Sequence, residues 1–165
     1  MATDNLILTA EIAEKKLQRM AFEIVEKNMG EKEIVLAGIK ESGVIIANII
    51  KTTLQEVYKG KIKVIEIDID KKNPKNISIP RENNFDNAVI IITDDVTNTG
   101  KTLLYALKPF LEFYPKKIQM LVLVERSYKQ FSVAPDYVGM SVSTATDEKI
   151  IVETNANEIT GARLV

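Results

Sequence analysis

The chain has 165 residues, of which 45% are hydrophobic, and its 22 Lys and Arg residues nearly balance its 23 Asp and Glu residues. The resulting net charge of -1 excludes a global basic field that would draw the chain to nucleic acid or to a membrane. The chain has no cysteine and no histidine, which excludes disulfides, thiolate catalysis, Ser-His triads and zinc sites built on these side chains. Any chemistry therefore depends on carboxylates, hydroxyls, Lys, Arg, backbone amides and hard cations.

The first part of the sequence predicts helices and strands in alternation. Thr9 is placed to cap a helix that continues to about residue 28, because apolar residues recur there at helical spacing. A short apolar run at 33–39 predicts a strand, which a turn connects to a helix with an apolar face at 43–60, ended by a glycine. The run at 61–69 predicts a second strand.

The second part continues the alternation. Residues 70–86 are polar, contain two prolines and predict a loop or a flexible hairpin. The run at 87–93 is the most continuously apolar, as expected for a strand buried on both faces. The later predicted elements are a helix over 101–114 distorted near Pro109, a buried strand over 117–125 and two short strands at 136–142 and 149–155. This order predicts an α/β fold of three layers with a mostly parallel central sheet.

The length suits one domain, which we expect to span residues 1–165. No apolar run approaches the ~20 residues that a membrane span needs. The first ten residues lack the charged start and the long apolar core of a secretory signal. We therefore expect a cytoplasmic protein that has no membrane partner.

The stretch VIIITDDVTNTGKT, residues 89–102, joins a buried strand to two aspartates and a threonine-rich loop. Its Gly-Lys-Thr ending is like that of an ATP-binding loop, but such a loop needs a glycine where this chain has Asp95. A carboxylate there would repel the phosphates, so the ATP-binding interpretation fails. A Walker B strand also fails, because the seven glycines supply no partner Walker A loop. The plainer alternative, solvated turn residues before a helix, leaves the cluster of threonines unexplained.

The same stretch offers one site for a phosphate and one for hydroxyl groups, and the two sites are separated by about the length of a ribose. Backbone N–H groups, threonine hydroxyls and the start of a helix predict a cradle for a monophosphate. Asp94 and Asp95, just upstream, are placed to accept hydrogen bonds from a sugar diol or to help hold Mg²⁺ through its waters. The combination suits a ribose 5-phosphate.

This stretch resembles the signature for phosphoribosyl pyrophosphate (PRPP) of type I phosphoribosyltransferases. The resemblance extends over nearly the whole chain, in the segments ILTAEIAEKKLQRMAFEIVEKN, VLAGIKESGVIIANII and VLVERSYKQFSVAPDYVGMSVSTATDEKIIV. It points to the branch of pyrimidine-operon attenuation regulators, which are also uracil phosphoribosyltransferases. It implies the three-layer fold of that family with a small hood, Mg²⁺ as cofactor, PRPP and a nucleobase or nucleoside monophosphate as ligands, and a homo-oligomer, most simply a homodimer.

The resemblance also implies roles for residues at the ends of three predicted strands. It assigns ribose binding and catalysis to Asp94 and Asp95. It assigns the 5-phosphate to the loop residues Thr97, Asn98, Thr99, Gly100, Lys101 and Thr102. It assigns pyrophosphate binding, through backbone amides of a strained loop, to the turn residues Lys40, Glu41, Ser42 and Gly43. It assigns base recognition and part of the hood to Glu125, Arg126 and Tyr128, although packing alone also explains Tyr128.

Two departures from that branch leave alternatives open. An arginine is expected where Ser42 stands, so an ordinary strand-to-helix turn is the alternative at 40–43. The segment 70–86 should be the loop that closes over PRPP, but it is short and Asn73 stands about where an arginine is expected. A solvated surface loop is the alternative there.

Three functions are therefore open from the sequence. The first is a Mg²⁺-dependent phosphoribosyltransferase that converts a pyrimidine base, most simply uracil, to its nucleoside monophosphate. The second is a nucleotide-sensing, RNA-binding regulator of pyrimidine genes, for which the first helix offers Lys15, Lys16 and Arg19; the solvated face of an amphipathic helix explains these residues more simply. The third is a family member that binds PRPP or nucleotides without turnover.

Overall fold

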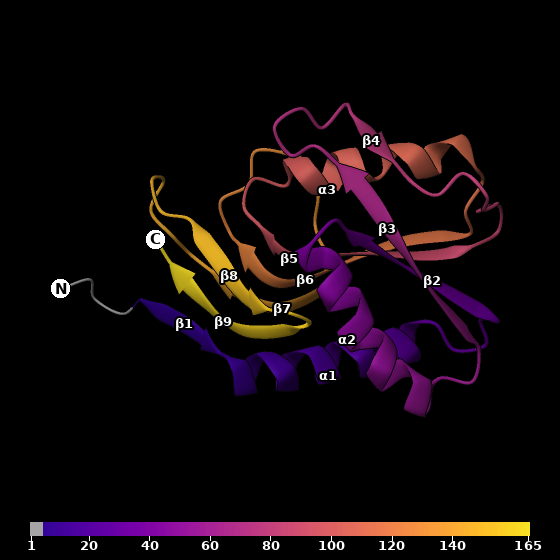
Figure 1. Ribbon diagram of the computed structural model, residues 1–165, viewed down its shortest axis with the longest axis horizontal. Helices are drawn as coiled ribbons and strands as arrows, with labels where there is room; N and C mark the ends of the chain where they lie inside the picture. The colour runs from indigo at the N-terminus through magenta and orange to yellow at the C-terminus, as the bar shows by residue number, and fades with distance from the viewer. Residues whose placement is uncertain (1–4) are drawn as a thin grey trace.

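The computed structural model describes residues 5–165, and its elements form three layers (Figure 1). The middle layer is a six-stranded sheet in the order β4-β3-β2-β5-β6-β7, in which every neighbouring pair is parallel except β3 and β4. Its strands are β2 (Glu33–Ile39), β3 (Lys61–Ile69), β4 (Ile77–Ser78), β5 (Val89–Thr97), β6 (Lys117–Arg126) and β7 (Tyr137–Val142). The prediction of a mostly parallel α/β fold is confirmed.

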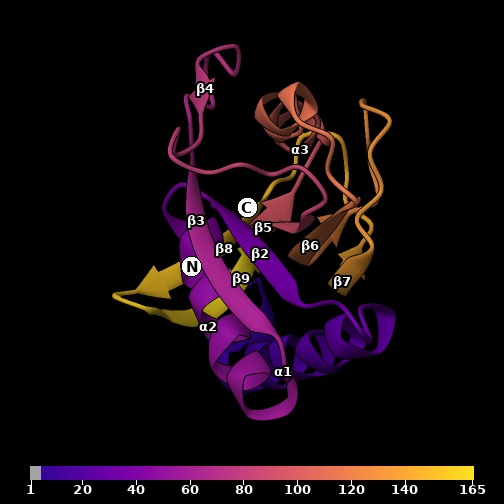
Figure 2. The same ribbon diagram turned by 90° about the vertical axis from the view of Figure 1, so that its right-hand side faces the viewer.

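Two pairs of helices cover the two faces of this sheet (Figure 2). They are α1 (Ala10–Lys27) and α2 (Ser42–Val57) on one face, and α3 (Lys101–Ala106) and the 3-10 helix η1 (Lys108–Glu112) on the other. Because successive strand residues point to opposite faces, Ile91 packs in the core of α1 and α2 while Ile90 packs in the core of α3. The central strands are therefore apolar on both sides, which explains their continuous hydrophobic runs.

A second, antiparallel sheet of three strands lies at the N-terminal end of α1 (Figure 1). Its strands are β1 (Leu6–Thr9), β8 (Ile150–Asn155) and β9 (Glu158–Leu164), in the order β1-β9-β8. Leu6 pairs with Arg163, so the two ends of the described chain meet in this sheet. Leu8 and Ile159 are buried in the same core as α1 and α2. This sheet corresponds to the small hood that the sequence predicts.

Local signals fix the ends of the first two helices. The Thr9 hydroxyl accepts a hydrogen bond from the N–H of Ile12 at 3.3 Å, so Thr9 caps α1 as predicted. The helix α2 ends at Val57, before the predicted glycine, because Tyr58 adopts an extended backbone. The Tyr58 hydroxyl donates to the carbonyl of Glu31, which fixes this early end.

Two predicted elements change length in the structure. The strand expected at 87–93 is β5, which continues to Thr97 because it pairs with β6 along its whole outer part. The helix expected at 101–114 is divided into α3 and η1 at Leu107, and Pro109 lies in the first turn of η1, so the distortion is near this proline as predicted. No helix within residues 5–165 is both long enough and apolar enough to cross a membrane.

The strands β1 and β9 were not predicted from the sequence. The turn before β9 contains Ala156 at φ +52°, a conformation for which hairpins favour glycine or asparagine. Without a glycine, this turn lacks the usual signal of a hairpin. The strand β1 has only four residues and ends at Thr9, the predicted cap of the first helix.

Phe85 anchors the long connection between β3 and β5. Its ring is 2% exposed and meets the rings of Phe110 and Phe113 edge to face, with centroids 5.3 Å apart in each pair. These contacts tie the end of segment 70–86 to η1, beside the α3 face of the sheet.

We expect Phe85→Ala to lower the free energy of unfolding by about 3–5 kcal/mol, because a large buried aromatic leaves a cavity. Urea unfolding measures the change. Phe22, at 54% exposure, provides the matched control: Phe22→Ala should change the free energy by no more than about 0.5 kcal/mol. Equal effects of the two substitutions would contradict the assigned packing.

Candidate functional site

The three strand ends that the sequence singles out lie on one edge of the sheet. β2, β5 and β6 are neighbours and parallel, so their carboxyl ends meet there. In open α/β sheets this edge is where ligands bind. The turn Lys40–Gly43 follows β2, the loop Thr97–Thr102 follows β5, and Ser127–Val133 follows β6.

Asp94 and Asp95 lie within β5 rather than after it, and both are buried, with exposures of 2% and 8%. One oxygen of each carboxylate accepts a backbone N–H: Asp94 from Asp95 at 2.9 Å, and Asp95 from Val96 at 2.8 Å. The backbone engages only this one oxygen of each carboxylate. Asp94 lines the cavity beside the threonine loop, whereas Asp95 does not.

Burial raises the pKa of the Asp94 carboxyl well above its ordinary value, and the neighbouring carboxylate of Asp95 raises it further. The ammonium group of Lys71 lowers this pKa in part. Asp94 therefore lies in a place that disfavours its charge until a cation or a set of hydrogen-bond donors arrives. Such perturbed groups are typical of ligand-binding sites.

The loop between β5 and α3 encloses a cavity of about 140 Å³. Its walls are Lys71, Asp94 and the run from Val96 to Leu103. Gly100 adopts φ +88°, a left-handed conformation that glycine takes without strain, and this allows the sharp turn into α3. The Thr99 hydroxyl accepts the N–H of Lys101 at 3.3 Å and steadies the start of the helix. All six loop residues that the sequence predicts for the 5-phosphate line this cavity.

The segment after β6 supports this loop from behind, which the sequence did not predict. The carbonyl of Thr99 accepts the N–H groups of both Gln130 and Phe131 at 3.0 Å. A Cβ atom on Gly100 would lie 3.2 Å from the carbonyl oxygen of Phe131. The loop is therefore held in shape by backbone contacts, which leave no trace in side-chain patterns.

Asn98 carries a buried side-chain oxygen, Oδ1, that has no hydrogen-bond partner. Buried polar atoms are nearly always paired, so this oxygen calls for a donor that a ligand or water supplies. Since Oδ1 is an acceptor, a hydroxyl or an N–H suits it and a phosphate oxygen does not. Contact of Asn98 with a phosphate would have to use its Nδ2 or backbone N–H.

The turn after β2 is strained and packs directly on β5. Glu41 adopts φ +71° and ψ -108°, an unusual conformation for a residue other than glycine, which costs about 1–3 kcal/mol. The Thr93 hydroxyl donates to the carbonyl of Gly43 at 2.8 Å. A Cβ atom on Gly43 would lie 2.5 Å from the carbonyl oxygen of Thr93, so only glycine permits this approach. The predicted strained loop is therefore present, next to Asp94.

A second cavity, of about 290 Å³, separates this turn from the end of β3. Its lining residues are Lys40, Glu41, Ile69, Asp70, Lys71 and Lys72. Lys40 is fixed there, since its N–H donates to the carbonyl of Ile67 at 3.0 Å and its ammonium pairs with Asp68 at 3.3 Å. Asp68 is also the main cause of the raised pKa of Lys40.

Lys71 lines both cavities, and sequence reasoning did not single it out for the site. Asn73, which stands about where an arginine is expected, lines neither cavity. The segment 70–86 folds back on β3 through β4, which pairs Ile69 with Ile77 and so holds its first residues near the site. The positive charge of segment 70–86 indicated that one of its basic residues could reach the site. Only the way the segment folds back on β3 shows that this residue is Lys71.

Glu125, Arg126 and Tyr128 line neither cavity. Arg126 is 4% exposed, and its guanidinium donates to the hydroxyl of Thr144 and to the carbonyls of Ala145 and Thr146. It also lies 5.1 Å from the centre of the Tyr128 ring. Arg126 thus holds the turn at 144–146.

Glu125 is occupied in a similar way. Its carboxylate pairs with the ammonium of Lys129 and accepts the Ser141 hydroxyl at 3.0 Å. Glu125 and Arg126, the two predicted charged residues of this region, therefore have protein partners and do not offer free charge to a ligand.

The donor set of the edge suits Mg²⁺ bound together with a phosphorylated ligand. Carboxylate oxygens are the hard donors that Mg²⁺ prefers. Within residues 5–165 no group of three or more Asp or Glu side chains is placed to hold a metal alone. Mg²⁺ characteristically uses one or two carboxylates and completes its shell with substrate phosphates and water, so Asp94 and Asp95 fit such a role.

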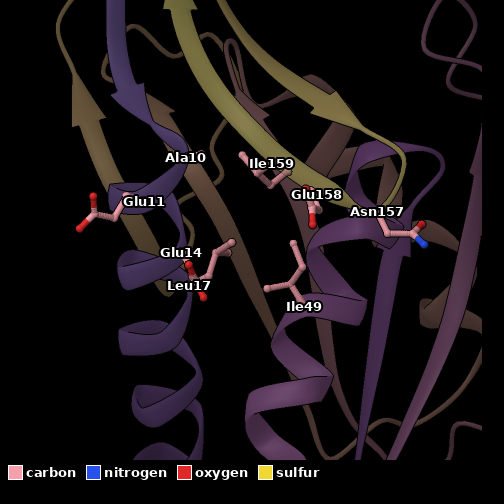
Figure 3. A pocket seen from close by; sticks show the side chains of 8 residues that line it. All are labelled: Ala10, Glu11, Glu14, Leu17, Ile49, Asn157, Glu158 and Ile159. Carbon is pink, nitrogen blue, oxygen red and sulfur yellow. The ribbon is translucent and has the colours of Figure 1, made fainter.

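A larger cavity of about 470 Å³ lies between α1, α2 and the turn before β9 (Figure 3). Three aliphatic side chains and three glutamates are among its lining residues: Leu17, Ile49, Ile159, Glu11, Glu14 and Glu158. Three carboxylates repel a phosphate group. The two smaller cavities at the strand ends, which contain lysines and backbone N–H groups, are the better candidate site.

Comparison with known proteins shows the family of this chain. The phosphoribosyl transferase domain matches residues 5–158. The chain is 34% identical to the bifunctional protein PyrR of Streptococcus pneumoniae (strain CGSP14) over 145 residues, which are 84% of this chain and 83% of the relative.

Solved structures of low sequence identity show the same fold. One is a hypoxanthine-guanine phosphoribosyltransferase from Bacillus anthracis, with a TM-score of 0.77 and 18% identity over 100% of both chains. Another is the hypoxanthine phosphoribosyltransferase of Trypanosoma cruzi, with a TM-score of 0.79 and 13% identity over 98% of this chain and 97% of that one. The chain belongs to the type I phosphoribosyltransferase family of enzymes, in the branch that includes the bifunctional PyrR proteins.

Proposed function

We propose that the protein transfers the phosphoribosyl group of PRPP to a pyrimidine base, most simply uracil, and so forms the nucleoside monophosphate. The observation that carries this proposal is a pair of neighbouring cavities at the carboxyl ends of β2 and β5, which share Lys71. PRPP has a phosphate at one end of a ribose and a pyrophosphate at the other, and two adjacent anion sites match this arrangement.

The cavity after β5 takes the 5-phosphate and the ribose. Backbone N–H groups and hydroxyls from Thr97 to Thr102 donate to the phosphate. Asp94 and Asp95 accept hydrogen bonds from the ribose hydroxyls through the oxygens that the backbone leaves available. The unpaired Oδ1 of Asn98 accepts a hydrogen bond from a hydroxyl or an N–H of the ligand. This bond orients the ligand, and a phosphate group without a proton cannot make it.

The cavity after β2 takes the pyrophosphate. Lys40, Lys71 and Lys72 supply positive charge. The first N–H groups of α2 have no acceptor within the helix and are available to an anion. The strained turn from Lys40 to Gly43 presents these groups beside Asp94, so both ends of one PRPP molecule are held at once.

The chemistry needs no histidine and no strong base. Breaking the bond between the anomeric carbon and pyrophosphate develops positive charge on the sugar and negative charge on the leaving group. Bound Mg²⁺ supplies charge neutralisation for the pyrophosphate. The residues of this chain fix the ribose at Asp94 and Asp95, hold the 5-phosphate and offset leaving-group charge through Lys40 and Lys71, which is catalysis by orientation and electrostatics.

The base site is the wall formed by the strand end of β6. We assign Glu125, Arg126 and Tyr128 to this wall as supports: Arg126 holds the turn at 144–146 and the Tyr128 ring stacks near its guanidinium. Uracil is proposed as the base because of the branch to which the chain belongs.

RNA binding is the second candidate, since the relative from Streptococcus pneumoniae is named bifunctional. Two of the three basic residues proposed for it are already engaged. Arg19 donates to the carbonyls of Val138 and Gly139 and pairs with Glu23, and Lys15 pairs with Glu11. With a net charge of -1, this surface favours the enzymatic role over RNA. A salt-sensitive, sequence-selective complex with a transcript leader would establish the second role.

The cellular setting follows from the reaction. We propose a cytoplasmic enzyme of pyrimidine salvage that acts as a homodimer or a larger homo-oligomer. Size-exclusion chromatography with light scattering measures the oligomeric state.

We expect the purified protein to form UMP from uracil, PRPP and Mg²⁺, detected by mass spectrometry, because the two cavities accommodate both ends of PRPP. In a thermal-shift assay PRPP with Mg²⁺ should raise the melting temperature more than ATP with Mg²⁺ does. A larger shift with ATP would reject the proposal. Stabilisation by PRPP without turnover of uracil, cytosine, hypoxanthine or guanine would establish a binding protein that lacks the enzymatic step.

We expect Asp94→Asn to stabilise the ligand-free protein and to weaken PRPP binding. The raised pKa means that folding favours protonated Asp94, so its contribution to stability is present at low pH and is lost as pH rises through the raised value. Asparagine removes this loss, and each kcal/mol regained raises the melting temperature by about 2–4 °C. The gain should therefore grow as the pH rises above the ordinary pKa of an aspartate carboxyl, and level off above the raised pKa.

The same substitution should weaken PRPP binding about tenfold or more, because hydrogen bonds to charged groups contribute about 1.5–3 kcal/mol. Calorimetry measures the affinity and differential scanning the stability. The exposed Asp147→Asn is the control, for which neither quantity should change. A variant that binds PRPP as the wild type does would remove Asp94 from the site.

A further inference from the structure

The cavity that we assign to pyrophosphate contains carboxylates as well as lysines. Lys40, Lys71 and Lys72 bring three positive charges to its walls, while Glu41 and Asp70 bring two negative charges. A free pyrophosphate anion carries several negative charges, so both carboxylates oppose its approach. The presence of carboxylates in an anion site requires a physical reason.

Glu41 is the carboxylate that has no partner. Asp70 accepts the N–H of Lys72 at 2.9 Å and so helps to shape its own turn. Glu41 is the N-cap residue of α2, yet its side chain accepts no N–H of that helix. Across residues 5–165, its carboxylate makes no hydrogen bond or ion pair with another side chain or with the backbone. The charge of Glu41 therefore serves neither the helix nor a salt bridge.

The backbone conformation of Glu41 is unusual for a glutamate. At φ +71° the position suits glycine, which would adopt this conformation without strain. The chain instead places an exposed glutamate there, and this glutamate is one of the residues that line the cavity. Strained residues at ligand loops are where a functional role is sought.

A divalent cation reverses the effect of this carboxylate. Mg²⁺ is bound in proteins through one or two carboxylates together with the phosphates of the substrate. A carboxylate that repels a bare pyrophosphate attracts the same group once it carries Mg²⁺, since the metal lies between the two sets of oxygens. The lysines of the cavity attract both forms and do not distinguish them.

We propose that the Glu41 carboxylate makes the pyrophosphate subsite selective for the magnesium complex over the free anion. The inference rests on the proposed function, because it takes this cavity as the pyrophosphate subsite. It adds a role for the side chain of Glu41 to the backbone role of its turn. Binding and release of pyrophosphate are then controlled by the metal and not only by the lysines.

Isothermal titration calorimetry on the purified full chain tests the proposal, with sodium pyrophosphate as the probe, once with Mg²⁺ and once with a chelator. The ratio of the two affinities is the quantity of interest. Glu41→Gln removes the charge and keeps the size, so the ratio should fall by roughly 3–10-fold, mainly through tighter binding of the free anion. Glu41→Gly should lower the ratio equally and also raise the melting temperature, because it removes the strained backbone.

Two controls accompany the variants. Glu112→Gln changes an exposed glutamate on η1 and should leave the ratio at its wild-type value. Ribose 5-phosphate probes the cavity after β5, and its affinity should be the same in the wild type and in Glu41→Gln.

The outcomes separate this inference from the proposed function. A wild-type ratio in Glu41→Gln, with PRPP still bound by the wild type, overturns the role of Glu41 and leaves the proposed function intact. A ratio that falls in Glu41→Gly but not in Glu41→Gln assigns the effect to the backbone and also overturns it. A wild type that binds neither PRPP, ribose 5-phosphate nor pyrophosphate overturns both proposals.

Discussion

The close contact between Gly43 and β5 determines the geometry of the whole candidate site. The Thr93 hydroxyl holds the carbonyl of Gly43 at 2.8 Å, and the missing side chain of Gly43 lets the start of α2 rest on the backbone of β5. This contact places the turn after β2 next to Asp94, so the two cavities after β2 and β5 lie within reach of one small molecule. A side chain at position 43 would separate α2 from β5 and enlarge the gap between the sites, whatever the other residues were.

The sequence predicted most of the helices and strands well, because these depend on local patterns. The strands at 33–39 and 61–69 are found with the predicted bounds, and the threonine loop forms one cavity, as its composition indicated. The remaining features depend on contacts between distant segments. Lys71 reaches both cavities only because β4 folds back on β3, and Arg126 turns away from the site because the turn at 144–146 offers it three acceptors. A sequence pattern contains neither contact.

The site is built from groups that folding alone does not favour. Asp94 is buried where its charge is opposed, Glu41 has a strained backbone and an unpaired carboxylate, and Asn98 keeps an oxygen without a donor. The surrounding sheet, whose central strands are apolar on both faces, provides the stability that tolerates these features. All three lie at the same edge of the sheet, where the proposed complex of PRPP with Mg²⁺ would satisfy them together.

The pairing of β1 with β9 has a consequence for how the chain folds during synthesis. β1 is synthesised long before its partner β9, because nearly all the described elements lie between them in the chain. Until β9 emerges, the edge of β1 has no strand beside it, and the apolar face of α1 lacks Ile159 and Ala162, which complete its core. Such distant pairings close slowly. The nascent protein therefore exposes this apolar surface of α1 until β9 has been synthesised, and this is the stage at which a chaperone would be most useful to it.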